Sequence, residues 1–178
     1  DFFDLFFLGE GEEVDLEVIR LYQRMRRDGW SKKKFLRAAA DIEGVYVPSL
    51  YDVRYHDDGT VAEIRPLDGV RPTVKKRIIA DLDSCYYPEY FVVPNTEIVF
   101  DRAMSEIFRG CIRGCRFCQA GFIYRPVREK SVDTIDRQSR ELCRTTGYEE
   151  FSLSSLSTSD YTQLEPLLDR LLSWAEPE

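Results

Sequence analysis

Hydrophobic residues recur at helical spacing near the start of the chain and predict a helix from about residue 12, ended by Gly29. Its apolar positions are Val14, Val18, Leu21, Tyr22 and Met25. Ser31 is a suitable N-cap for a second, shorter helix over 32–44. Residues 5–8 predict a short buried strand before a glycine turn. This order of strand, turn and helix is typical of the last unit of an open α/β sheet.

The period of the apolar positions changes at Val45, from helical spacing to alternation. Residues 51–66 alternate on either side of Asp58 and Gly59, which predicts a β-hairpin. Residues 66–95 then predict a connecting arm that packs across a surface, because prolines interrupt any regular element there. These prolines are Pro66, Pro72, Pro88 and Pro94.

A second α/β pattern begins near Glu97. Strands are expected at 97–100 and 104–110, a helix capped by Ser131 at 132–146, a strand at 149–157 and a helix from 161 to the last residue. This order predicts parallel strands joined by right-handed crossovers. Two such units cannot close a sheet or a barrel, so we expect the array to continue beyond the printed residues.

The fold class predicted from these patterns is therefore α/β, in three parts. Residues 1–44 form the tail of an open α/β domain, residues 45–96 the hairpin and arm, and residues 97–178 the first units of a β/α array. We found no internal repeat and no low-complexity segment.

Composition narrows the class of protein. The chain is 43% hydrophobic and 32% charged, which is typical of a folded protein, and its net charge of −7 argues against a nucleic-acid surface. Its apolar stretches are shorter than the roughly 20 residues that a membrane helix needs, and no secretory signal is evident. Five cysteines without regular spacing favour a reducing cytoplasm over a disulfide framework.

Three of the five cysteines fall in the stretch RGCIRGCRFCQAGFIYRP, at Cys111, Cys115 and Cys118. Glycines in this stretch favour a loop, and closely spaced thiolates need a metal to balance their charge. A structural zinc site normally takes four ligands, and a ferredoxin-type cluster takes four cysteines. An iron–sulfur cluster with three protein ligands would leave one iron open to a small molecule. Structural zinc, or no metal at all, is the alternative.

The spacing C-x3-C-x2-C, with Phe117 before the last cysteine in a loop after a strand, resembles the radical S-adenosylmethionine (SAM) superfamily. The resemblance implies a 4Fe-4S cluster held by Cys111, Cys115 and Cys118, whose open iron chelates SAM, with Phe117 beside the adenine through its backbone. It also implies reductive cleavage of SAM to a 5′-deoxyadenosyl radical, a partial TIM-type barrel, and a reductant such as a flavodoxin or ferredoxin.

The longer strings FLGEGEE, VYVPSLYDV, RGCIRGCRFCQAGFIYRPVREKS and SLSSLSTSDY resemble a bacterial branch of this superfamily with a cobalamin-binding-like domain before the barrel. The resemblance covers nearly the whole chain. It implies that residues 1–44 are the tail of that domain, 45–96 the hairpin and arm, and 97–178 the start of the barrel. Cobalamin is then a further candidate cofactor, although the motif that ligates cobalt in many such domains is not among these residues.

The chain departs from the superfamily where many relatives carry a Gly-Gly-Glu type motif at the end of the second strand. Ser155 and Ser157 are the candidates to accept from the methionine ammonium, and local turn bonds are the alternative role. Arg125 and Arg128 could bind a carboxylate or phosphate, or could be surface residues flanking a helix. Cys143 is expected to be a half-buried structural cysteine.

Two classes of function follow. The first is a radical SAM enzyme with an unknown substrate and unknown catalytic residues, and this segment by itself is expected to be inactive. The second is a non-catalytic iron–sulfur electron carrier or redox sensor. Perturbation of the cluster spectrum by SAM would distinguish the two.

Overall fold

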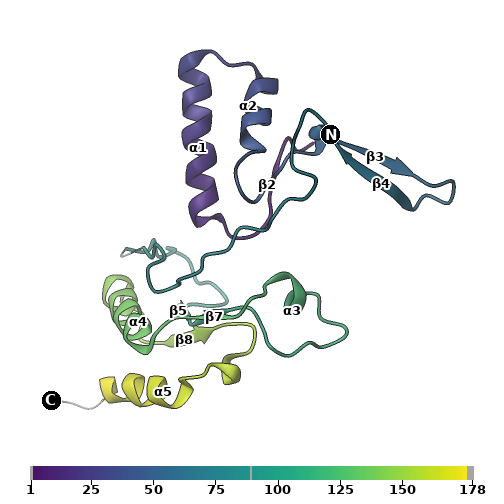
Figure 1. The fold of residues 1–178 in the computed structure, drawn as a ribbon. Coiled ribbons are helices and arrows are strands. Elements are labelled where there is room, and N and C mark those ends of the chain that lie inside the picture. The colour runs from purple at the N-terminus through teal and green to yellow at the C-terminus, as the bar shows by residue number, and fades with distance from the viewer. Residues whose placement is uncertain (1, 89, 176–178) are drawn as a thin grey trace. The chain divides into compact units, whose positions relative to one another are not determined.

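The computed structural model describes residues 2–88 and 90–175, and the chain divides into two compact units, Asp1–Ile79 and Ala80–Glu178 (Figure 1). The described residues form a mixed α/β structure with four two-stranded sheets, β1–β2, β3–β4, β5–β8 and β6–β7. They contain no closed barrel. The α/β class is thus confirmed, whereas the three-part domain division and the partial barrel remain predictions.

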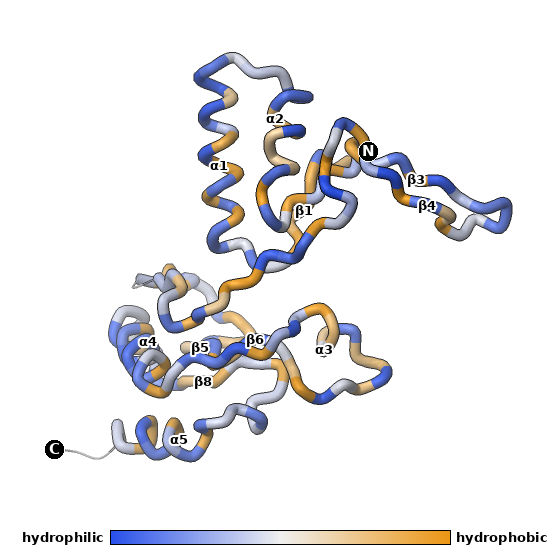
Figure 2. The backbone as a smooth tube through the Cα atoms, in the orientation of Figure 1, coloured by the Kyte–Doolittle hydropathy of each residue, from blue (hydrophilic) through white to orange (hydrophobic). Residues whose placement is uncertain are grey.

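Two helices contribute half of the buried residues in the core of the first unit. The helix α1 (Gly11–Asp28) ends at Gly29 in the left-handed conformation, and α2 (Lys32–Ala39) begins where the Ser31 hydroxyl accepts a hydrogen bond from the Lys34 amide. Apolar positions recur along both helices (Figure 2). They pack together in a cluster that includes Val14, Val18, Phe35, Leu36 and Ala39. The helical spacing and both caps predicted from the sequence are confirmed.

The strand β1 (Phe6–Phe7) differs from the sequence prediction in burial and in pairing. Both phenylalanines are exposed, and β1 pairs in antiparallel fashion with β2 (Val45–Tyr46). The second helix also ends at Ala39, earlier than predicted, and Gly44 occupies a turn that leads into β2. The chain therefore reverses after α2 to pair with β1, and no parallel sheet forms in this unit within the described residues.

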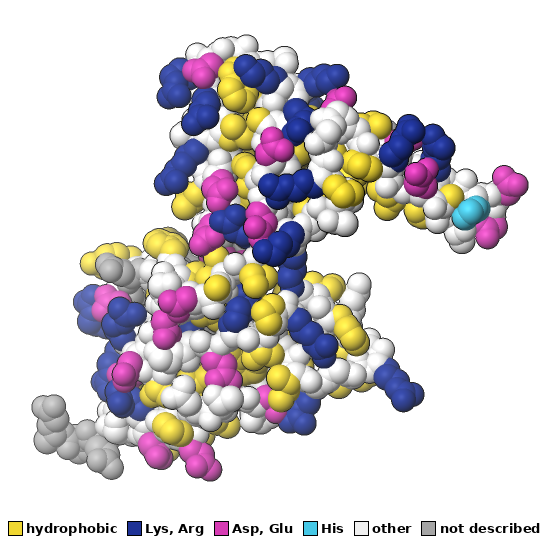
Figure 3. Space-filling view, in the orientation of Figure 1, with side chains coloured by type: hydrophobic (Ala, Val, Ile, Leu, Met, Phe, Trp, Pro, Cys, Tyr) yellow, Lys and Arg dark blue, Asp and Glu magenta, His cyan; other side chains and the backbone are white. Residues whose placement is uncertain are grey.

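The predicted hairpin is confirmed. After a short 3-10 turn (Pro48–Leu50), β3 (Tyr51–Tyr55) pairs with β4 (Val61–Pro66) in antiparallel register, with an irregularity between Arg54 and Tyr55. Most of its side chains are exposed, and charged and apolar groups both lie on its surface (Figure 3). The hairpin extends away from α1 and α2 (Figure 1).

The arm after the hairpin has no helix or named strand between residues 67 and 102 in the described parts of the chain. The strand predicted at 97–100 is therefore wrong, and the side chains of Ile98, Val99 and Phe100 are exposed. Without a partner strand, the β-forming residues of this segment have nothing to pair with.

Parallel strands organise the second unit. The strand β5 (Ala103–Glu106) pairs in parallel with β8 (Phe151–Ser154), and α4 (Val132–Thr146) lies between them in the sequence. The caps Ser131 and Gly147 bound α4 as predicted. A 3-10 turn (Thr158–Asp160) leads to α5 (Leu164–Leu172), which a final 3-10 turn (Ser173–Ala175) follows. The parallel pairing and the element order are confirmed, except that residues 176–178 lie outside the described residues.

The strand predicted at 104–110 is divided at Ile107 into two strands, and two further small features that follow it were not predicted. The strand β6 (Phe108–Arg109) follows β5 and pairs in antiparallel fashion with β7 (Arg128–Glu129). The short helix α3 (Ala120–Ile123) lies between them. Neither two-residue strand has enough length to show a period in the sequence.

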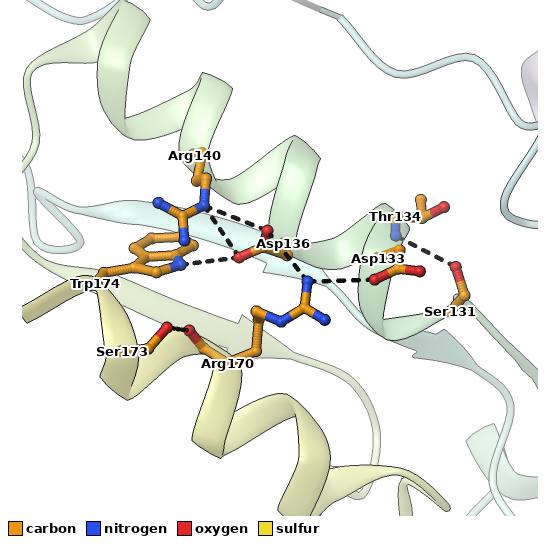
Figure 4. Close-up of polar contacts among 8 residues, drawn as sticks. All are labelled: Ser131, Asp133, Thr134, Asp136, Arg140, Arg170, Ser173 and Trp174. Carbon is orange, nitrogen blue, oxygen red and sulfur yellow. Dashed lines mark hydrogen bonds and ion pairs between the residues drawn. The ribbon is translucent and has the colours of Figure 1, made fainter.

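The core of the second unit lies between the β5–β8 pair and the helices α4 and α5. It contains Ile107, Phe108, Ile135, Tyr161 and Leu167, all buried. At the surface of the α4–α5 contact, the Asp136 carboxylate accepts a hydrogen bond from Trp174 Nε1 at 2.8 Å and contacts Arg140 and Arg170 (Figure 4).

The arm is attached to the start of α4 by a carboxylate. Asp83 Oδ1 accepts a hydrogen bond from the Ser131 backbone amide at 2.7 Å, next to the helix N-terminus. Burial by itself would raise the pKa of Asp83, but the hydrogen bonds from Ser131 and Thr134 outweigh it and lower the pKa overall.

Adjacent leucines on α5 provide a test of this core. Replacing Leu167, which is fully buried, by Ala should lower the free energy of unfolding by about 2–5 kcal/mol, because it leaves a cavity. Replacing Leu168, which is 42% exposed, should cost less than about 1 kcal/mol. Denaturant unfolding followed by Trp174 fluorescence in a Trp30→Phe background measures both. Equal losses would contradict the assigned packing of α5.

The contact of Asp83 with Ser131 predicts a pH dependence of stability. Because the folded pKa is below that of the unfolded chain, near 3.9, the stabilisation is present above about pH 4 and is lost as the pH falls through the folded pKa. Asp83→Asn should lower the free energy of unfolding by about 1 kcal/mol at pH 6. The difference between the two proteins should shrink below pH 4, and a difference that does not change with pH would contradict the prediction.

Candidate functional site

The three clustered cysteines lie in a loop, residues 110–127, that is closed at its base by β6 and β7. Arg109 pairs with Arg128, and Phe108 pairs with Glu129. The Lys130 amide also donates to the Ile107 carbonyl at 2.9 Å. Both ends of this segment, which we call the cysteine loop, are thus fixed next to the carboxyl end of β5.

Gly110 allows the two ends of the cysteine loop to approach each other. Its φ is +92°, and a Cβ atom at this position would lie 2.8 Å from the Tyr124 carbonyl oxygen and 2.9 Å from that of Pro126. Any other residue would combine an unfavourable backbone conformation with overlap against main-chain atoms that have little room to move.

The three thiols are free, with Cys111 and Cys118 half-buried and Cys115 exposed. The Arg113 amide donates to Cys111 Sγ at 3.4 Å, and the Cys118 amide donates to the Cys115 carbonyl at 3.1 Å. Within residues 2–88 and 90–175, no three side chains of His, Cys, Asp or Glu lie close enough together to hold a metal ion. The loop therefore brings the thiols into one short segment without bringing the sulfur atoms together.

Two of the three arginines beside these cysteines are paired with carboxylates. Arg109 Nη2 lies 2.9 Å from Glu106 Oε2, at the end of β5, and Arg113 Nε donates to Asp160 Oδ2 at 2.7 Å. Arg116 is exposed. The carboxylates therefore balance much of the positive charge that Arg109 and Arg113 bring to the thiols.

The predicted serines lie directly after β8, at the same edge as the cysteine loop. In the parallel register, Glu106 at the end of β5 is opposite Ser154 at the end of β8. Ser155 Oγ is 2.9 Å from Thr158 Oγ1, and Ser157 Oγ donates to Asp160 Oδ2 at 2.6 Å. Both hydroxyls therefore make local turn bonds, and each oxygen keeps lone pairs that could accept from a ligand.

Asp160 is a site residue that the sequence analysis missed. Its carboxylate joins Ser157 of the strand end to Arg113 of the cysteine loop. The hydrogen bond from Arg113, followed by that from Ser157, lowers the pKa of Asp160, and the same contact raises the pKa of Arg113. The only signal in the sequence was its place in the string SLSTSDY, which does not reveal a partner 47 residues away.

The remaining predicted residues of the loop have contrasting surroundings. The Phe117 side chain is 94% exposed, so its ring is not needed for packing in this unit. Arg125 lies over the Phe122 ring at 5.2 Å, and Arg128 Nε donates to the Pro126 carbonyl at 3.1 Å. These two arginines stabilise the loop, which favours their structural role over the proposed anion-binding role.

The two cysteines outside the loop lie elsewhere in the second unit. Cys143 on α4 is half-buried, and burial raises the pKa of its thiol, which is typical of an unreactive cysteine. Cys85 lines a cavity of about 740 Å³ between the arm and α4, together with Tyr87, Arg137 and others. No residue of the cysteine loop lines this cavity.

The glycine turn just before α1 is explained by packing. Gly9 has a φ of +116°, and a Cβ there would overlap the carbonyl oxygen of Arg77. Arg77 Nη2 contacts Glu13 at 2.6 Å and Glu17 at 2.7 Å. The turn thus receives the arm of the same unit, and these contacts give no support to the expected cobalamin cofactor.

Gly110 and Gly121 form a matched pair for testing the base of the loop. Gly110→Ala should lower the free energy of unfolding by about 2–4 kcal/mol, from the left-handed φ and the overlap with Tyr124 and Pro126. Gly121→Ala should be neutral or slightly stabilising, because α3 has space for a Cβ there. Thermal unfolding measures both, and a Gly110→Ala variant as stable as the parent would contradict the close approach.

Two comparisons with known proteins, of the family and of a single relative, gave a match. The family model described as "Radical SAM proteins, N-terminal" matches residues 1–48. An uncharacterised protein of Methanocaldococcus jannaschii is 30% identical over 173 residues, which cover 96% of this chain and 31% of that protein. No solved structure matches the chain, and no helix in the described residues is long and apolar enough to cross a membrane. The family match supports membership of the radical SAM superfamily.

Proposed function

We propose that the chain is part of a radical SAM enzyme in which Cys111, Cys115 and Cys118 hold a 4Fe-4S cluster. One observation carries the proposal: three free thiols lie in a loop at the carboxyl end of a parallel strand pair. Reactive groups of β/α enzymes gather at such strand ends, where the loops of neighbouring strands meet. The family match over residues 1–48 supports it independently.

The donor set fits a cluster with three protein ligands. The loop offers three sulfur atoms within eight residues, and its backbone already donates one amide hydrogen bond to sulfur, from Arg113 to Cys111. Without a metal to balance their charge, nothing draws three thiolates together, so their separation in the structure is compatible with this role. The loop segment between its fixed ends would have to close around the cluster.

When bound, such a cluster supplies one electron that breaks the S–C5′ bond of SAM, giving methionine and a 5′-deoxyadenosyl radical. Ser155 and Ser157 would accept from the methionine ammonium at the end of β8. The exposed loop backbone beside Phe117 would lie along the adenine.

The same proposal includes the fold of the second half of the chain, the source of the electron and the location in the cell. Residues 97–178 would be the start of a β/α barrel, because β5, α4, β8 and α5 have the order of its first two units. An external reductant such as a flavodoxin or ferredoxin would supply the electron. Because iron–sulfur clusters and free thiols are preserved in reducing surroundings, we expect the protein in the cytoplasm.

A second candidate function is electron transfer without SAM chemistry. The exposure of the cysteine loop favours it, since Ile112 is 64% exposed and Phe117 94% exposed, and apolar side chains at a cluster edge suit contact with a redox partner. SAM distinguishes the two functions, because only a cluster with an open iron changes its electron paramagnetic resonance spectrum when SAM is added. Formation of 5′-deoxyadenosine after reduction with dithionite would further support the enzyme.

Two cysteine variants test the ligand assignment. In anaerobic reconstitution of the full-length protein, Cys115→Ala should abolish the uptake of about four iron and four sulfide per chain. Cys143→Ala should leave it unchanged, because this thiol lies half-buried on α4. Iron and sulfide assays, with the visible absorption spectrum, measure both. If Cys143 proved as necessary as Cys115, a cluster with four thiolates and no open iron would replace the proposal.

A further inference from the structure

The cysteine loop has a second attachment besides its base. Arg113 lies between Cys111 and Cys115, and its guanidinium binds the carboxylate of Asp160, which follows β8. Arg113 Nε donates to Oδ2 at 2.7 Å, and Nη2 donates to Oδ1. This two-pronged arrangement fixes the orientation of the guanidinium as well as its distance, which a single contact does not.

The carboxylate is itself held in place before it meets Arg113. The Asp160 side chain is only 9% exposed, whereas that of Arg113 is 60% exposed. Ser157 Oγ donates to Asp160 Oδ2 at 2.6 Å, and the next residue, Tyr161, is buried in the core with its hydroxyl on the Lys130 carbonyl at 2.8 Å. Asp160 is therefore the partner held by the rest of the unit, and Arg113 is the exposed group that binds to it.

We propose that Arg113 and Asp160 are positioning residues that hold the cysteine loop against the end of β8 before the cluster binds. The part of this inference that concerns the cluster rests on the proposed function. The base of the loop, at β6 and β7, leaves its middle free to move, and the Arg113 contact restrains the stretch between the first two ligands. Pre-ordering this stretch lowers the entropy cost of gathering three ligands.

The same contact relates the two parts of the proposed SAM site. The carboxylate that binds Arg113 also binds Ser157, so the loop that carries the thiols and the hydroxyl at the strand end share one anchor. Loss of the anchor should weaken SAM binding as well as the retention of iron. If Arg113 acted only through its charge, by favouring thiolates, Arg113→Lys would behave like the parent protein. If the two-pronged contact matters, the same variant should lose function, because Lys cannot form that contact.

The first test uses the metal-free chain and the exposed Phe117 as a reporter. Chymotrypsin cleavage after Phe117, followed by mass spectrometry, should be about three to ten times faster in Asp160→Asn and in Arg113→Lys, as expected for loss of a charged hydrogen-bond pair. Cleavage after Tyr55, in the hairpin of the other unit, is the internal reference. Arg116→Lys, at an exposed position of the same loop, is the matched control and should leave the rate unchanged.

Two further variants separate a local effect from general destabilisation. The double variant Arg113→Lys/Asp160→Asn should be cleaved no faster than the faster single variant, because both single changes break one interaction. Leu167→Ala, which weakens the core but leaves Arg113 and Asp160 unchanged, should accelerate cleavage at buried sites but not after Phe117. Variants cleaved after Phe117 at the parent rate, or single effects that multiply in the double variant, would overturn the proposal.

The second test uses the reconstituted full-length protein. With a ferrous-iron chelator present, the half-life of the cluster in Arg113→Lys and Asp160→Asn should fall to about a third or less, with no change in Arg116→Lys. The concentration of SAM that produces half of the spectral change in electron paramagnetic resonance should rise at least about threefold in the same two variants. If Arg113→Lys kept the cluster half-life and the SAM response of the parent, the role of Arg113 would be its charge alone and the positioning role would be overturned.

The two tests distinguish failure of the proposed cluster from failure of the proposed positioning role. If the parent protein takes up no iron, the proposed cluster is wrong, while the proteolysis of the metal-free chain still decides whether Arg113 and Asp160 order the loop. If the parent binds iron and SAM but the variants match it in both assays, the positioning role is wrong and the proposed function stands.

Discussion

The parallel pairing of β5 with β8 is the constraint on which the candidate site depends. Parallel strands place their carboxyl ends at one edge, so the cysteine loop after β5 and the serines after β8 meet there. The pairing in turn needs α4 to cross from one strand to the next, and Ile135 of α4 lies in the same buried core cluster as Ile107, directly after β5. An antiparallel pairing of the same two strands would place the serines at the opposite end from the thiols.

The ion pairs at this edge hold the loop backbone in place more than they change the charge around the thiols. Arg109 is bound by Glu106 and Arg113 by Asp160, so these two arginines tie the loop to the end of β5 and to the turn after β8. An arginine used in this way contributes little free positive charge to the sulfur atoms. It contributes order to a loop whose three thiols lie apart.

In the first unit, a glycine turn also allows a close approach, but to another backbone segment of the unit. The turn at Gly9, in the string FLGEGEE, receives the backbone of Arg77, and Glu13 of α1 binds its guanidinium. A glycine required for close approach of another backbone has the same signature in the sequence as a glycine required for close approach of a ligand. Only the position of the arm distinguishes them.

The sequence by itself determined the features that depend on neighbouring residues. Ser131 and Gly147 bounded α4, Gly29 ended α1, and Asp58 with Gly59 set the hairpin, because caps and turns are decided by groups a few residues apart. The spacing of the cysteines likewise identified the loop and the chemistry of its donors.

The tertiary structure alone decided the features that join distant segments. It paired β1 with β2, left 97–100 without a strand partner, and brought Asp160 to Arg113 across 47 residues. Such contacts are selected by the packing of whole elements, in which hydrophobic burial outweighs local preference, and no local pattern records which carboxylate a given arginine will meet.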